Sequence, residues 1–117
     1  MATSTCRGCG LALAATGGPA HRYIPSSPEC WAVYGEVLAR EYSDPAIFAG
    51  AHELSVDTYA VQHAAGDPAS SLTTHLVGLH LSLERGMAHD RIAPLRVRFS
   101  WEHEHAAIAA IAAELTW

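Results

Sequence analysis

The sequence predicts a mainly α-helical protein, an irregular helical bundle of about four helices that follows a loop-rich N-terminal segment. Two observations support this fold class. Apolar residues recur at helical spacing in separate stretches after residue 27, whereas the first 27 residues contain Gly-Gly-Pro and Pro-Ser-Ser clusters that interrupt any regular pattern. Since 117 residues suffice for one domain with its own core, we expect a single domain, with a loop segment at residues 1 to 27, containing one short hairpin at most, and the bundle at residues 28 to 117.

The first two predicted helices carry the same start signal. Ser27 precedes Pro28, and Asp44 precedes Pro45. A Ser or Asp side chain accepts a hydrogen bond from the first turn of a helix, and Pro at the first helical position has no N–H to leave unpaired. We therefore expect one helix over about residues 28 to 42, and a second from residue 45 to the turn at Gly66.

The third helix is expected over about residues 71 to 85, where leucines line one face and Gly86 supplies a stop. Its other faces are also partly apolar, so it should be the central helix of the bundle. Residues 95 to 99, LRVRF, alternate apolar and basic side chains and predict a short strand. Ser100 is then expected to cap a final helix that runs to the C-terminus.

The composition argues against several classes of protein. The chain has seven Arg and no Lys against 12 Asp plus Glu, a net charge of −5, which argues against binding to a nucleic-acid backbone. It shows no secretory signal pattern and no long charge-free apolar run, so we expect a soluble, cytoplasmic protein without a membrane partner. Because half of the residues are apolar, we also expect a homo-oligomer.

Three cysteines form the most specific chemical pattern in the sequence. Cys6 and Cys9 form a C-x-x-C pair in a Gly-containing turn, and Cys30 falls in the first turn of the first predicted helix. A C-x-x-C turn supplies half of the ligands of many zinc sites, and a helix N-terminus favours a thiolate. We therefore expect these cysteines to bind Zn²⁺, with a thiol redox pair and three unrelated thiols as the alternatives.

The fourth ligand of such a site must come from elsewhere, because the first predicted helix lacks the second cysteine that usually follows. The candidates are His21, in the loop after the C-x-x-C pair, His63, on a helical stripe with His52 and Tyr59, and His75, beside the leucine face of the third helix. The stripe predicts that His52, Tyr59 and His63 share one environment. The other four histidines are expected in solvent or at a polar edge.

Several motifs together resemble an uncharacterised family of small bacterial proteins, a domain of unknown function: CRGCG, HRYIPSSPECWAVYGEVLAREYSDP, DTYAVQH and HLVGLHLSLERG. The resemblance spans residues 6 to about 86, and the C-terminal segment from residue 96 departs from the pattern. The resemblance implies no activity. It implies only that the three cysteines and His63 belong to recurring motifs. His63, at the end of the second predicted helix, is therefore the first choice of fourth ligand, His75 the second and His21 the third.

These observations favour a small zinc-binding protein with a structural metal and a binding or regulatory role, because three thiolates and one imidazole leave no open position on a tetrahedral ion. One alternative is a small metal-dependent enzyme for hydrolysis or proton transfer that uses His52, Asp57, His63 and His75. A catalytic set would converge on a solvent-connected hollow, whereas structural polar groups would only be hydrogen-bonded to one another. Asp57 lies one position from the apolar stripe of its helix, so a partly buried carboxylate and an exposed helix carboxylate are both open for it.

The second alternative is a thiol redox protein that uses Cys6 and Cys9, with Cys30 as a resolving thiol. No nucleophile elbow, phosphate-binding loop or H-E-x-x-H motif indicates a named reaction.

Overall fold

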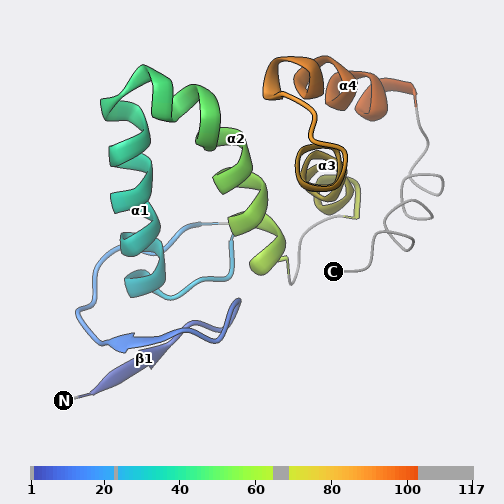
Figure 1. Cartoon of the computed structure of the whole chain (residues 1–117). Helices are drawn as coiled ribbons and strands as arrows, with labels where there is room; N and C mark the ends of the chain where they lie inside the picture. The colour runs from blue at the N-terminus through green and yellow to red at the C-terminus, as the bar shows by residue number, and fades with distance from the viewer. Residues whose placement is uncertain (1, 23, 65–68, 103–117) are drawn as a thin grey trace.

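The computed structural model describes residues 2–22, 24–64 and 69–102. These residues form an antiparallel β-hairpin followed by four α-helices, the third of which continues into one turn of π-helix (Figure 1). The mainly helical fold class is therefore confirmed. The elements are β1 (Thr3–Thr5), β2 (Ala12–Ala14), α1 (Pro28–Ser43), α2 (Pro45–Gln62), α3 (Ala69–Leu79), the π-helical turn η1 (His80–Glu84) and α4 (His89–Glu102).

The predicted starts of α1 and α2 are confirmed at the level of single hydrogen bonds. The side chain of Ser27 accepts from the backbone N–H of Cys30 at 3.0 Å, and that of Asp44 accepts from the N–H of Ala46 at 2.8 Å. Proline occupies the first turn of both helices. α1 and α2 pack against each other and run in opposite directions, and the hairpin lies beside the beginning of α1 and the end of α2 (Figure 1).

α3 lies between α2 and α4, as expected for the central helix (Figure 1). Its inner face buries Leu76, Val77 and Leu79, which removes apolar surface from water. The helix predicted over residues 71 to 85 corresponds to α3 together with η1. Gly86 ends it with a φ of 62°, a conformation in which other residues are strained.

Residues 95 to 99 do not form the predicted strand. They lie inside α4, which also contains Pro94. Ile92 is fully buried, and Arg96, four residues later, reaches a carboxylate of α2. This spacing of four places both side chains on one helix face, so packing against α2 and α3 overrides the five-residue alternation.

Ser100 also lies within α4 and does not cap a new helix. The remainder of the predicted C-terminal helix, residues 103 to 117, lies outside the described residues. Among the residues that the structure does describe, no helix has both the length and the apolar character needed to cross a bilayer.

Candidate metal centre

Three separate elements bring four side chains to one point. Cys6 and Cys9 lie in the turn between β1 and β2, Cys30 lies in the first turn of α1, and His63 follows the last residue of α2. The three sulfurs and one imidazole nitrogen all lie within 4.8 Å of one another. Cys6, Cys30 and His63 are buried, whereas Cys9 is exposed. The four form a group that can hold a metal ion.

The donor atoms face one another closely. Cys9 Sγ lies 3.8 Å from Cys30 Sγ, and His63 Nε2 lies 3.5 Å from the same sulfur. The tautomer of His63 follows from its other nitrogen: Nδ1 lies 2.7 Å from the carbonyl oxygen of Tyr59, which can only accept, so Nδ1 carries the proton. The lone pair of Nε2 therefore points at the sulfurs, and the backbone of α2 holds the ring in this orientation.

Backbone N–H groups and burial act in opposite directions on the thiols. Burial raises the pKa of Cys6, but the N–H groups of Cys9, Ser27 and Gly8 donate to its sulfur and bring the pKa down to about 6. Burial raises the pKa of Cys30 to about 11, and the neighbouring sulfurs add to that rise. Without a cation, the group thus favours one thiolate beside a protonated thiol. A bound metal ion deprotonates a coordinating thiol outright.

The turn that carries Cys6 and Cys9 depends on two glycines. Cys6 exchanges backbone hydrogen bonds with the turn, its N–H donating to Leu11 and its carbonyl accepting from Gly10, both at 2.8 Å. Gly10 has a φ of +81°. Gly8 packs so tightly that an added Cβ would lie 2.3 Å from His63 Cδ2 and 2.3 Å from the Pro25 carbonyl oxygen. The close approach of the turn to the imidazole therefore requires glycine at position 8.

A family model described as a family of unknown function (DUF5946) matches residues 4–117. The chain belongs to this family. The match includes the C-terminal segment, which the sequence motifs had placed outside the resemblance. Neither the curated proteins nor the solved structures contain a match to this DUF5946 protein.

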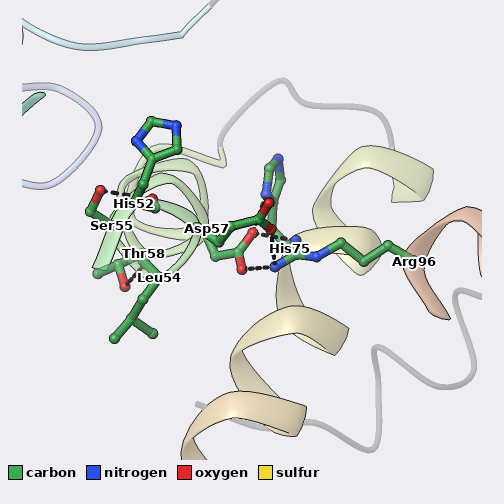
Figure 2. Close-up of polar contacts among 8 residues, drawn as sticks. His52, Leu54, Ser55, Asp57, Thr58, His75 and Arg96 are labelled. Atoms are coloured by element: carbon green, nitrogen blue, oxygen red, sulfur yellow. Dashed lines mark hydrogen bonds and ion pairs between the residues drawn. The ribbon is translucent and has the colours of Figure 1, made fainter. Parts of the chain in front are cut away.

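In this DUF5946 chain the other predicted histidine ligands lie away from the sulfurs. His75 Nδ1 lies 2.8 Å from Asp57 Oδ1, so His75 is hydrogen-bonded to a carboxylate (Figure 2). His21 Nδ1 accepts from the backbone N–H of Ile24 at 2.9 Å, and its ring packs on Trp31. His63 is the only histidine that joins the three cysteines among the described residues.

The four residues of the proposed catalytic set do not converge on one point. His63 belongs to the metal group, whereas Asp57 lies between His75 and Arg96. The ring of Tyr59 stacks on that of His63, as the stripe predicted. His52 is not part of the metal group and its Nδ1 lies 2.9 Å from Glu41, so the shared environment does not extend to the metal group for His52. Asp57 is 2% exposed, so the exposed alternative for this carboxylate is wrong.

Sequence reasoning missed two charged partners of this set, Glu41 for His52 and Arg96 for Asp57. Glu41 lies in the last turn of α1, 11 residues before His52. Arg96 lies in α4, 39 residues after Asp57. No local spacing links either pair. The sequence pattern assigns no role to Glu41 and places Arg96 in the predicted strand at residues 95 to 99. Finding them would have required knowing that these charged side chains are buried. The spacing of residues along a helix does not indicate burial for charged residues.

A hollow of about 470 Å³ borders the metal group. Cys9 and His63 line it together with Leu11, Val33 and Val37. The last three side chains are each 44% exposed. Beside the sulfurs, the protein thus presents an apolar surface that solvent reaches.

Proposed function

We propose that this protein binds one Zn²⁺ ion through Cys6, Cys9, Cys30 and His63, that the metal is structural, and that the protein has a binding or regulatory role. The observation that carries the proposal is the convergence of three sulfurs and one correctly oriented imidazole nitrogen from three separate elements. The zinc would supply the positive charge that lets all three thiols ionise together.

The spacing of the donors supports zinc as the ion. Two thiolates bound to tetrahedral zinc lie about 3.8 Å apart, and a thiolate and an imidazole nitrogen about 3.5 Å apart, because the Zn–S and Zn–N distances are about 2.3 and 2.0 Å. The structure has 3.8 Å between Cys9 and Cys30 and 3.5 Å between Cys30 and His63. Hard cations such as Mg²⁺ and Ca²⁺ prefer oxygen ligands, so this donor set does not suit them.

A structural role follows from the number of ligands and from what they connect. Four protein ligands fill a tetrahedral ion and leave no position for substrate. The hairpin has only three residues in each strand, and an isolated hairpin of that size is not stable in water. Zinc would therefore hold the hairpin against the ends of α1 and α2.

The thiol redox alternative has less support from the geometry. A redox pair needs two sulfurs that reach bonding distance and uses an imidazole only as a base for one thiol, whereas this imidazole faces a group of three sulfurs. His63 is buried and its tautomer is set by the Tyr59 carbonyl. Metal binding accounts for that orientation, and a disulfide does not.

Elemental analysis of the purified protein tests the proposal. We expect about one zinc per chain, and loss of that zinc in Cys30→Ser and in His63→Ala, because either change opens the tetrahedral site. His75→Ala is the matched control and should keep its zinc, since His75 faces Asp57. Metal-free protein with three freely titratable thiols, or zinc retained by Cys30→Ser and lost by His75→Ala, would show that the ligand set is wrong.

A further inference from the structure

A second hollow lies between α1, α2 and α3, apart from the zinc ligands. Its volume is about 310 Å³. Aromatic side chains form much of its wall, among them Trp31, Tyr34 and Tyr59, and two histidines, His52 and His75, complete it. The hollow shares Tyr34 and Tyr59 with the one beside the zinc ligands, but none of the four zinc ligands lines it.

Buried carboxylates hold both histidines of this hollow. Glu41 lies 2.9 Å from His52 Nδ1, and Asp57 lies 2.8 Å from His75 Nδ1. The side chains of Glu41 and Asp57 are 4% and 2% exposed. Burying two carboxylates is costly unless each is paired and hydrogen-bonded, so the two histidines are part of what these buried carboxylates require.

Each carboxylate is itself held by another side chain. The hydroxyl of Ser55 donates to Glu41 at 2.8 Å. Arg96 donates from both terminal nitrogens to the two oxygens of Asp57, a bidentate pair (Figure 2). Both carboxylates are thus fixed as acceptors, which makes Nδ1 the protonated nitrogen of His52 and His75.

The consequence is a free lone pair on each Nε2. Among the residues that the structure describes, no hydrogen-bond donor meets Nε2 of His52 or His75, and the two side chains keep 19% and 22% of their surface exposed. The two imidazole rings extend to the same side of α2 (Figure 2). The structural zinc site makes no use of either ring. They are two hydrogen-bond acceptors on residues that line an aromatic hollow.

We propose that this hollow binds a small, flat, uncharged molecule of one or two rings that donates one hydrogen bond to His52 Nε2 and another to His75 Nε2. The volume is at the lower end of the range for ligand pockets, about 300 to 1,000 Å³, which limits the ligand to this size. Its aromatic walls suit a planar ring. The described residues that line it include no Arg, Asp or Glu, and the carboxylates behind the two histidines already have partners, so no unpaired counter-charge faces the ligand.

Binding of a donor-bearing aromatic probe tests this site. The probe is para-bis(hydroxymethyl)benzene, which has a hydroxyl at each end, and para-xylene is its counterpart without donors. Binding is followed by NMR through the imidazole nitrogen shifts. We expect the diol to bind and to change the nitrogen chemical shifts of Nε2 in His52 and His75. Para-xylene should bind at least about tenfold more weakly, since two hydrogen bonds are lost.

Asparagine substitutions separate recognition from folding. In His52→Asn and His75→Asn the amide N–H can still donate to Glu41 or Asp57, but the Nε2 acceptor is gone. Each substitution should weaken binding of the diol by about three- to tenfold and leave the binding of para-xylene unchanged. His80→Asn is the control, because His80 has the same arrangement with Glu84 at 2.8 Å but lies outside this hollow.

The outcomes are distinct from those of the zinc test. All three asparagine variants should retain their zinc and their thermal midpoint within a few degrees. No binding of the diol at millimolar concentration, equal binding of both probes, or an equal loss in His80→Asn would overturn the proposal and leave the zinc proposal standing. Zinc-free protein that still binds the diol through His52 and His75 would refute the zinc proposal and support this one.

Discussion

At the scale of single residues, the candidate zinc site depends on atoms that set orientation as much as on its ligands. The carbonyl of Tyr59 fixes the tautomer of His63, and the N–H of Ser27 donates to the sulfur of Cys6. Gly8 acts by its lack of a side chain, because the turn must approach His63 and Pro25 closely. The four ligands alone do not form this site, because the residues next to them determine where each donor atom points.

Gly8→Ala should therefore weaken both the fold and the zinc site. The new Cβ would meet a backbone oxygen that cannot move aside, so we expect a loss of about 1 to 3 kcal/mol in the free energy of unfolding and a lower zinc content. Denaturant unfolding and elemental analysis measure the two effects. Gly35→Ala is the control: Gly35 lies inside α1 with no atom near its Cβ position, so that change should stabilise by about 0.5 to 1 kcal/mol. Equal effects of the two changes would contradict this account.

At the scale of elements, the hairpin and the helices differ in what stabilises them. α1 and α2 have capped starts and pack on each other. The hairpin has six strand residues in the register Thr3 with Ala14, and it buries little besides Cys6. Its attachment to the helices runs mainly through the sulfurs and through Glu29, which accepts from the N–H groups of Thr16 and Gly17.

Removal of zinc by a chelator should release the hairpin while the helices remain. We expect the amides of β1 and β2 to lose protection from hydrogen exchange, with little change in those of α2 and α3, because opening follows local rather than global stability. Helical circular dichroism should change little at room temperature, and the thermal midpoint should fall. Chelator should have no effect on Cys30→Ser, which has no zinc to lose. Cooperative loss of α2 protection in the wild type would show that the metal supports the whole fold.

At the scale of the whole molecule, an ion pair joins the second helix of the fold to the last one that the structure describes. Arg96 of α4 pairs with Asp57 of α2 and lies 3.3 Å from Glu53. Asp57 also orients His75 of α3, so three helices meet at one buried carboxylate. Nearby, Gly78 of α3 leaves room for the pair, since an added Cβ would lie 2.5 Å from Asp57 Oδ2.

Arg96→Met should cost about 3 to 5 kcal/mol in the free energy of unfolding, because it leaves the charge of Asp57 buried without its partner. Arg91→Met, on an exposed part of the same helix, is the matched control and should change stability by less than about 0.5 kcal/mol. The double variant Asp57→Asn with Arg96→Met should recover part of the loss, since no unpaired charge then remains. Denaturant unfolding of the wild type, Asp57→Asn, Arg96→Met and the double variant measures the coupling. Additive effects in the double variant would show that the pair contributes no coupling energy.

The sequence by itself determined the helical class, the starts of α1 and α2 and the three cysteine donors. These features are local: Ser27 and Asp44 act on backbone groups within three residues, and the C-x-x-C pair needs only its own turn. The sequence favoured His63 as the fourth ligand because it ends a helix and belongs to a motif, but two other histidines remained as alternatives. What distinguishes it is the position of the hairpin against α2, which no spacing in the sequence contains.

Only the tertiary structure decided the state of the charged residues. Asp57 is buried because Arg96 reaches it from another helix, and residues 95 to 99 are helical because Ile92 and Arg96 must face the same neighbours. The sequence pattern of LRVRF favours a strand, but the energy of one buried ion pair and one buried isoleucine exceeds the weak preference of five residues. In the same way, Glu41 and Asp57 became the orienting groups of two histidines through contacts between helices. Such pairings depend on which helix faces meet, and they follow from packing rather than from local order along the chain.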